Sequence, residues 1–239
     1  MYALSFTLGY LYLHYSKPGK RMGLSIKDKD NLVAATIAGV ILGGRLGYIL
    51  FYNLGFYLSN PLKIFAVWEG GMSFHGGLLG VTIALLIFIH KKKLNLWRIS
   101  DAITGFVPLG VMFVRIGNFI NGELYGRIAD KFCINFPTDP LNCRYPSQLL
   151  QALLEGLILF LILQFVAYRN PKHGTVSGLF LLLYGLFRII AEFFREPDPQ
   201  IGFLWGVITQ GQLLSTFMII GGIILLLATR TWKKDSGKI

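Results

Sequence analysis

Apolar residues along this chain come in long continuous runs, and the runs do not alternate with polar positions. A helix needs about 20 mostly apolar residues to cross a bilayer. Seven runs reach or approach that length: 1–14, 33–53, 72–90, 101–120, 149–168, 176–194 and 204–229. Helices satisfy their own backbone hydrogen bonds in lipid, so runs of this kind are predicted to be helical. The pattern therefore predicts an all-α polytopic membrane protein with seven transmembrane helices.

The first run is shorter than the others. A helix from Tyr2 to Tyr15 would span only about 21 Å at 1.5 Å per residue. No basic region precedes it and no small-residue cleavage site follows it, so it is not interpreted as a signal peptide. We expect either a tilted, partly buried helix or a natural N-terminus further upstream. No linker divides the chain, so residues 1–239 are expected to form one integral membrane domain with small outer loops.

Composition and charge fit this interpretation. Apolar types make up 54% of the chain and charged types 15%, against about 25% charged residues in soluble domains, which excludes a disordered chain and most soluble enzymes. If the N-terminus lies outside, the cytoplasmic segments hold 15 of the 23 Lys and Arg residues and the outer loops hold 5. This asymmetry predicts an outside N-terminus and a cytoplasmic C-terminus. The net charge of +11 then faces anionic lipid headgroups, and nucleic acid is not an expected partner.

Polar residues inside the predicted spans are candidates for a functional site, because such groups are costly in lipid. The topology places most of them toward the outer half of the bilayer, on five different spans. They are Tyr2, Arg45, His75, Arg115, Asn118, Asn121, Glu123, Arg188 and Glu192. We expect them to line a polar cavity open to the outer half of the bilayer. Glu155, near the outer end of its own span, is interpreted as a structural residue.

Three of these candidates also have a structural interpretation. Arg188 and Glu192 are four residues apart on one helix face and can simply pair with each other. Arg45 lies among glycines at a spacing typical of close helix packing, so a structural role and an auxiliary role are equally open. A lone histidine is more often a core residue, but His75 is followed by two glycines, which favour close approach of a ligand or a backbone.

The segment 115–126 gathers Arg115, Asn118, Asn121, Glu123 and three glycines at a membrane boundary. The glycines predict a re-entrant or unwound turn that lines a cavity. A guanidinium group offers a planar fork of donors, which suits a phosphate, and neighbouring amides add further donors. We therefore expect phosphate binding here, with a simple polar helix cap as the alternative.

Cysteine and histidine residues are few. Cys133 and Cys143 both fall in the outer loop 121–148, where they can bridge if the compartment is oxidising or remain free thiols if it is not. The four histidines are too scattered along the sequence to predict a metal cluster.

Six motifs along the chain match one family. They are Gly-Gly-Arg-Leu-Gly-Tyr at 43–48, Trp-Glu-Gly-Gly-Met-Ser-Phe-His-Gly-Gly-Leu at 68–78, the segment 115–126, Tyr-Pro-Ser-Gln at 145–148, Gly-Leu-Phe at 178–180 and the segment 184–195. On these motifs the chain resembles the bacterial prolipoprotein diacylglyceryl transferases, and the resemblance covers nearly the whole chain. Family members carry a segment before the tyrosine that matches Tyr2, so a further N-terminal segment is expected upstream.

The resemblance implies an enzyme of the bacterial inner membrane whose active site faces the outer leaflet. Its family moves the sn-1,2-diacylglyceryl group of phosphatidylglycerol to the lipobox cysteine thiol of preprolipoproteins. The products are a thioether and glycerol 1-phosphate, and this is the first step of lipoprotein maturation. The implied partners are phosphatidylglycerol, preprolipoprotein signal peptides and membrane lipids, with no cofactor and no metal. The implied catalytic residues are His75, Arg115 and Arg188, and the implied substrate-binding residues are Arg115, Asn118, Glu123, Gly126, Glu192 and Tyr2.

The residues suit this chemistry. A thiol has a pKa of about 8.5 and attacks as the thiolate. His75 is the one cavity candidate whose ordinary pKa suits a general base near neutrality, and Arg115 is placed to bind the donor phosphate. An arginine-bound thiolate, with His75 only as a positioning donor, is the alternative mechanism. A transporter is the alternative function, and it predicts polar groups strung through both halves of the bilayer. A non-catalytic scaffold would not need a histidine beside two arginines.

Overall fold

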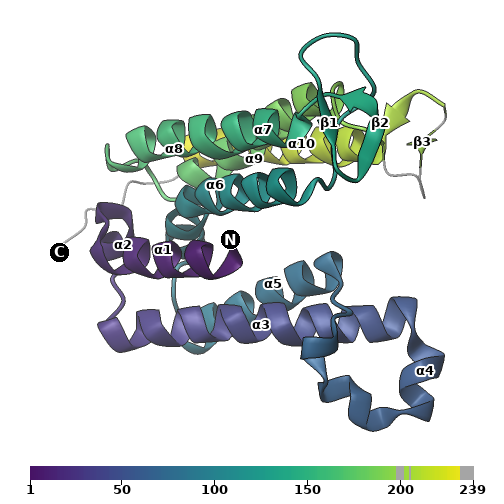
Figure 1. Ribbon diagram of the computed structural model, residues 1–239. Coiled ribbons are helices and arrows are strands. Elements are labelled where there is room, and N and C mark those ends of the chain that lie inside the picture. The colour runs from purple at the N-terminus through teal and green to yellow at the C-terminus, as the bar shows by residue number, and fades with distance from the viewer. Residues whose placement is uncertain (198–201, 205, 232–239) are drawn as a thin grey trace. The chain divides into compact units, whose positions relative to one another are not determined.

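The computed structural model describes residues 1–197, 202–204 and 206–231. The side chains of Tyr2 and Phe74 and the basic residues of 232–239, which contributed to the predicted orientation, lie outside the described part. The chain divides into two compact units, one formed by 1–22 with 100–239 and one formed by 23–99. Figure 1 shows both units built mainly from helices.

The larger unit contains long helices and two short strand pairs. Its elements are α1 (Tyr2–Tyr15), α2 (Lys17–Arg21), most of α6 (Leu96–Asn121), β1 (Ile134–Phe136), β2 (Asp139–Arg144), α7 (Ser147–Gln151), the π-helix η3 (Ala152–Ile158), α8 (Leu159–Ala167), α9 (Thr175–Glu192), β3 (Phe203–Leu204), β4 (Ile208–Thr209) and α10 (Gln210–Thr231). Helix α9 packs against both α8 and α10. Leu159 and Leu163 of α8 form a buried core with Val176 of α9. The antiparallel hairpin of β1 and β2 stands where α6 ends and α7 begins (Figure 1).

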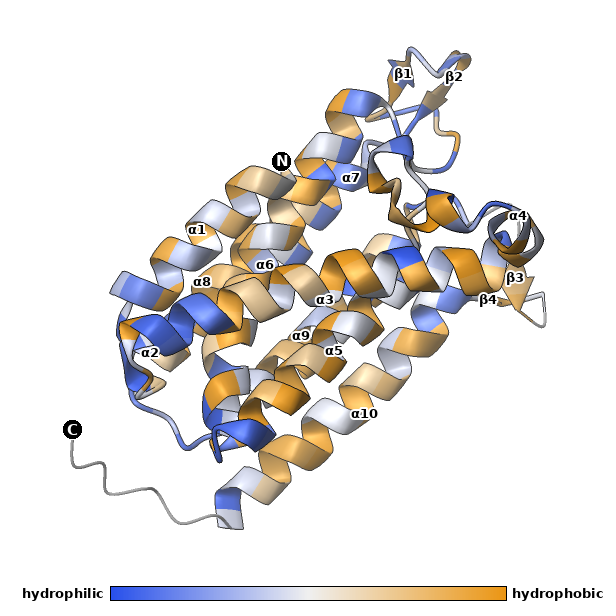
Figure 2. Ribbon diagram, turned by 90° about the horizontal axis from the view of Figure 1, so that it is seen from below, coloured by the Kyte–Doolittle hydropathy of each residue, from blue (hydrophilic) through white to orange (hydrophobic). Residues whose placement is uncertain are grey.

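The continuous helix from Ser147 to Ala167 has the polarity of a membrane helix rather than of a soluble one. Every fourth residue of its outward face is an exposed hydrophobic side chain: Leu149, Leu153, Leu157, Leu161 and Phe165. The buried face carries Gln148, Gln151 and Glu155 instead. Figure 2 shows orange, hydrophobic residues covering most helices, with blue residues gathered at helix ends and connections. An apolar exterior with a polar interior is the arrangement expected of a protein embedded in lipid.

In the smaller unit, glycines allow its two longest helices to pack closely against each other. Its elements are α3 (Ile26–Tyr52), α4 (Leu54–Ser59), the 3₁₀ helices η1 (Pro61–Phe65) and η2 (Val67–Glu69), and α5 (Phe74–Lys91). A Cβ on Gly43 of α3 would lie 2.7 Å from the Cα of Gly80 in α5, and one on Gly47 would lie 2.7 Å from the Cα of Gly76. Side chains at these positions would force the helices apart, so the small-residue spacing predicted from the sequence serves close packing.

All seven apolar runs coincide with helices, and five of the described helices are long and apolar enough to cross a membrane: α3, α6, α7 to α8, α9 and α10. Helix α1, with 14 residues, is as short as its run predicted, and α5 is also short. The last run begins later than predicted, at Gln210 instead of residue 204, because Phe203–Leu204 and Ile208–Thr209 pair as strands. The two strand pairs add to the predicted all-α architecture without interrupting a span.

Candidate active site

Helix α6 carries the first two site residues in its last turns. Arg115 and Asn118 are both partly buried within the helix, which continues to Asn121. The helix predicted over 101–120 is therefore present, and the predicted turn is confined to the residues after Asn121. The chain leaves the helix only at Gly122, whose φ of 65° suits glycine, and the Glu123 amide then donates to the Asn118 carbonyl at 2.8 Å.

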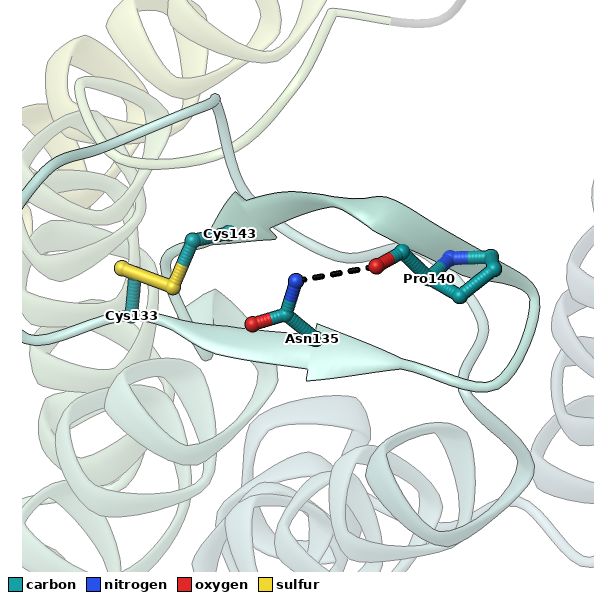
Figure 3. Close-up of a disulfide and its surroundings, with 4 residues drawn as sticks. All are labelled: Cys133, Asn135, Pro140 and Cys143. Atoms are coloured by element: carbon teal, nitrogen blue, oxygen red, sulfur yellow. Dashed lines mark hydrogen bonds between the residues drawn. A yellow bond between two sulfur atoms is a disulfide. The ribbon is translucent and has the colours of Figure 1, made fainter.

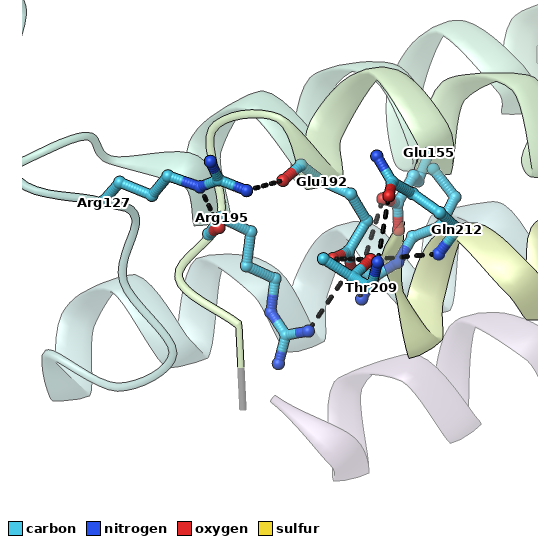
Figure 4. Close-up of polar contacts among 7 residues, drawn as sticks. Arg127, Glu155, Glu192, Arg195, Thr209 and Gln212 are labelled. Carbon is cyan, nitrogen blue, oxygen red and sulfur yellow. Dashed lines mark hydrogen bonds and ion pairs between the residues drawn. The ribbon is translucent and has the colours of Figure 1, made fainter. Parts of the chain in front are cut away.

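The C-terminal end of helix α9 carries charged side chains that form buried ion pairs and hydrogen bonds around Glu192. Arg188 forms an ion pair with Glu192, as their four-residue spacing predicts. The Nη1 of Arg195 lies 3.4 Å from Oε1 of the same glutamate, and the Thr209 hydroxyl donates to its Oε2 at 2.9 Å. Figure 4 shows these contacts converging on Glu192. The carboxylate of Glu192 therefore pairs with two arginines and accepts a hydrogen bond from Thr209 of β4, the residue directly before α10.

Glu155 supplies a second carboxylate from the π-helix η3. Its side chain is fully buried, and its Oε1 lies 3.6 Å from Nη1 of Arg188. Its charge also interacts with that of Arg115. The sequence analysis interpreted Glu155 as a structural residue, and this ion pair is compatible with that interpretation. One buried residue of η3 thus pairs with the arginine of α9.

Among the described residues of this cluster, arginines outnumber glutamates. Three arginines, 115, 188 and 195, face two glutamates, 155 and 192. Arg127 adds a further positive charge at the edge, where it donates to the backbone carbonyls of Glu192 and Arg195 (Figure 4). Guanidinium groups suit a ligand that accepts several of their hydrogen bonds. A phosphodiester anion, which accepts the planar fork of a guanidinium group, fits this requirement.

Gly126 joins the loop after α6 to the end of α9. Its amide donates to the Tyr145 carbonyl at 2.9 Å, and it forms a β-bridge with Arg195. A Cβ here would lie 2.6 Å from the Tyr145 carbonyl oxygen and would also collide with that of Phe194. The close approach of three backbone segments explains why glycine occupies the position.

The hairpin beside the site is cross-linked. Cys133 and Cys143 form a disulfide (Figure 3), so the bridged alternative is the right one. Asn135 adds a side-chain hydrogen bond to the Pro140 carbonyl at 3.0 Å. Arg144 forms an ion pair with Asp139. The hydrogen bonds from Arg144 and then Asn142 hold the pKa of Asp139 below its usual value of 3.8.

His75 belongs to the smaller unit and lies in the first turn of α5. It is exposed, and the preceding Ser73 caps the helix by accepting from the Gly76 amide at 3.2 Å. Arg45 of α3 is buried and donates to backbone carbonyls of the connection that leads to this helix: those of Lys63, Ile64, Ala66, Gly70 and Gly71. Of the two roles left open for Arg45, this geometry favours the structural one.

Tyr2 is the first residue of α1. Its neighbour Met1 packs on α6, since a Cβ on Gly117 would lie 3.1 Å from the Met1 Cγ. The backbone of Tyr2 therefore begins its helix close to the turn that carries Asn118.

Several residues of this region were not predicted as site residues. They are Gln148, Gln151, Glu155, Arg195 and Thr209. The signal available in the sequence was the spacing of Gln148, Gln151 and Glu155, which puts three polar residues on one face of an otherwise apolar helix. In the part of the chain that the structure describes, no three His, Cys, Asp or Glu side chains gather in a way that suits a metal ion.

Comparison with known proteins identifies the family. The family model described as prolipoprotein diacylglyceryl transferase matches residues 1–228. Phosphatidylglycerol–prolipoprotein diacylglyceryl transferases of Rickettsia bellii (strain OSU 85-389) and Azospirillum brasilense are 48% and 49% identical to this chain. The alignments cover 95% of this chain and 90% of the Rickettsia protein, and 96% of this chain and 88% of the Azospirillum protein. The resemblance inferred from the motifs is confirmed: the chain belongs to the prolipoprotein diacylglyceryl transferase family and is a multi-pass membrane enzyme, a diacylglyceryl transferase.

Proposed function

We propose that this protein transfers the sn-1,2-diacylglyceryl group of phosphatidylglycerol to the lipobox cysteine of a preprolipoprotein. The relatives named above carry phosphatidylglycerol and prolipoprotein in their names. The observation that supports the proposal in this chain is the cluster of arginines around Glu155 and Glu192, whose guanidinium groups suit a lipid phosphodiester. Membrane lipids and lipobox signal peptides are the expected partners, and the reaction needs no cofactor.

The reaction breaks the bond between the glycerol carbon of the diacylglyceryl group and its phosphate oxygen. The cysteine sulfur forms a thioether with that carbon, and glycerol 1-phosphate leaves. The leaving group gains negative charge as the bond breaks, so guanidinium groups at the phosphate stabilise the transition state more than the bound lipid. Arg115 and Arg188 are assigned this role. Glu155 and Glu192 orient Arg188, and they keep its side chain in place before the lipid arrives.

The thiol must lose its proton before or during attack. His75 is assigned as the general base, because an imidazole accepts a proton near neutral pH. The competing mechanism has a thiolate bound by arginine, with His75 only positioning the peptide. The pH profile of His75→Gln distinguishes them, because removal of a base abolishes a limb of the profile that removal of a positioning donor leaves in place.

The other predicted residues surround the phosphate. Asn118 and Glu123 stand at the end of α6, and they are proposed to hold the lipid headgroup or the peptide by hydrogen bonds. Tyr2 is assigned to the same side because the side chain of its neighbour Met1 lies against Gly117. Gly126 and Glu192 are proposed to act indirectly, through the loop after α6 and through Arg188.

The proposed setting is the bacterial inner membrane, with one integral domain, seven spans and the active site toward the outer leaflet. The N-terminus then lies outside and the C-terminus in the cytoplasm. The disulfide of the hairpin supports this orientation, because it suits the oxidising side of that membrane.

The test is an assay of the purified protein in phosphatidylglycerol vesicles with a lipobox peptide. We expect release of glycerol phosphate that requires the peptide cysteine and falls in both His75→Ala and Arg115→Ala. A peptide with serine in place of cysteine is the control. Release that ignores the peptide, or that both variants support fully, contradicts the proposal. Absence of release from a folded enzyme returns the transporter alternative to consideration.

A further inference from the structure

Two glutamines on one face of the α7 to η3 helix are buried without satisfying their hydrogen-bonding groups. Gln148 and Gln151 are both 0% exposed. The Nε2 of Gln148 donates to the Glu123 carbonyl at 2.7 Å, but its Oε1 has no hydrogen-bond partner among the described residues. Neither Oε1 nor Nε2 of Gln151 has one there. A buried polar atom left unpaired costs about 1–3 kcal/mol, so each of these atoms calls for an explanation.

A third glutamine in the same helical run shows how this fold treats an amide with a purely structural role. Gln164 of α8 donates from Nε2 to the Gly105 carbonyl at 2.7 Å and accepts at Oε1 from the Tyr12 hydroxyl at 3.1 Å. Both ends of its amide are therefore satisfied by the protein. Gln151, only 13 positions earlier, has neither end satisfied. The contrast points to a ligand for Gln151 rather than to packing.

The two glutamines belong to a helical run that contacts the chain just after α6 at one end and Arg188 further along. Gln148 donates a hydrogen bond to the carbonyl of Glu123, which follows α6. Gln151 is one helical turn further along the same face, and Glu155, another turn on, reaches Arg188. A group bound at the amides is therefore a neighbour of a phosphate bound by Arg188.

The chemistry of the amides selects a neutral ligand with hydroxyl groups. Two carbonyl oxygens accept and one NH₂ group donates, which matches hydroxyl groups that both donate and accept. The amides carry no charge and so add nothing to the attraction of an anion. We propose that Gln148 and Gln151 form a subsite for the hydroxyl groups of the glycerol headgroup attached to the donor phosphate, and that this subsite sets the headgroup preference of the enzyme. The inference rests on the proposed transferase function.

The test compares two donor lipids that differ only in these hydroxyl groups. Vesicles contain either phosphatidylglycerol or phosphatidylpropanol, whose headgroup is an unsubstituted n-propyl chain, and mass spectrometry measures the thioether peptide, which is the same product from both lipids. A site built to bind a hydroxyl group rejects an analogue without it strongly. We expect the wild-type kcat/KM to favour phosphatidylglycerol by about 100-fold or more. Gln151→Met and Gln148→Met keep the side-chain volume, and each is expected to narrow that ratio by about 10-fold, mainly by slowing transfer from phosphatidylglycerol.

Gln164→Leu is the matched control, because it removes a satisfied amide from the same helical run. It is expected to lower the melting temperature and to leave the ratio between the two lipids unchanged. An unchanged ratio in both methionine variants, or equal use of the two lipids by the wild type, overturns the subsite while the transferase function stands. Absence of product from phosphatidylglycerol in the folded wild type overturns the function itself, and the subsite with it.

Discussion

The Nη1 atom of Arg188 lies 3.6 Å from Oε1 of Glu155, a fully buried carboxylate on a different helix. The same guanidinium group pairs with Glu192 one turn further along α9. One arginine is therefore fixed from two directions by side chains that water does not reach. Donors that are already oriented need little reorganisation when charge develops on a leaving group. This arrangement suits Arg188 for the phosphate of the donor lipid.

Glu155→Gln tests whether the π-helix carboxylate orients Arg188. The substitution keeps the size of the side chain but leaves Arg188 with one counter-charge. Breaking a buried ion pair from one side typically costs about 3–5 kcal/mol, and we expect kcat to fall by about 10-fold or more. Transfer is measured with phosphatidylglycerol and a lipobox peptide. Glu155→Asp should recover part of the loss, and Glu196→Gln, which removes an exposed carboxylate paired with Arg144, should have little effect.

Arg115→Lys tests the requirement for a guanidinium group on α6. An ammonium group keeps the charge but cannot reproduce the planar fork that binds two phosphate oxygens. Loss of one such donor typically lowers kcat by about 100-fold, and that is the loss expected here. The measurement is the steady-state rate of glycerol phosphate release. A lysine variant that works at a near-normal rate would show that Arg115 acts only as a point charge.

Much of the fold was predictable because continuous apolar runs in a sequence indicate membrane helices. The pairing of Arg188 with Glu192 followed from a spacing of four residues in one helix, and both cysteines fell in one loop. The finer features depend on tertiary contacts. The sequence does not tell that residues 203–204 and 208–209 pair as strands ahead of α10.

The candidate site was predicted only in part, for a related reason. Glu155 was interpreted as structural, and the sequence alone does not show that it lies beside Arg188, which is on another helix. Gln148 and Gln151 are polar residues in an apolar run, yet only their burial and their unpaired atoms single them out. Arg45 was undecided between two roles until its carbonyl partners were known.

Gly126→Ala tests the backbone junction between the loop after α6 and the end of α9. The added Cβ would collide with two carbonyl oxygens that belong to backbone and cannot rotate away. We expect a loss of stability of about 2 kcal/mol or more, in the range of other steric changes in packed interiors, together with loss of transfer. Thermal unfolding in detergent measures the loss of stability. Gly110→Ala, where a Cβ meets nothing within 4 Å, is the control and should leave both properties near wild type.

Arg45→Lys tests the structural role of the arginine in the smaller unit. An ammonium group has three donors on a single nitrogen, so it cannot replace the guanidinium group, which donates to five backbone carbonyls here. Hydrogen bonds to charged groups are worth about 1.5–3 kcal/mol each, so the connection 60–71 should open more readily. Amide hydrogen exchange across 60–71 measures this opening. Lys91→Gln, at an exposed position of α5, provides the comparison, and unchanged protection in Arg45→Lys would contradict the assignment.

The hairpin of β1 and β2 should lose stability in acid through Asp139. Hydrogen bonds from Arg144 and Asn142 lower the pKa of this carboxyl group from its usual value of 3.8. A group with a lowered folded-state pKa stabilises the folded form above its unfolded pKa, and the contribution disappears as the pH falls through the folded value. The amides of β1 and β2 should therefore exchange faster, after correction for intrinsic rates, as the pH drops below about 3.8. Asp139→Asn should remove that pH dependence. Asp130→Asn changes an exposed carboxylate of the same loop and should preserve it, so a pH dependence that survives in Asp139→Asn would assign the effect to another group.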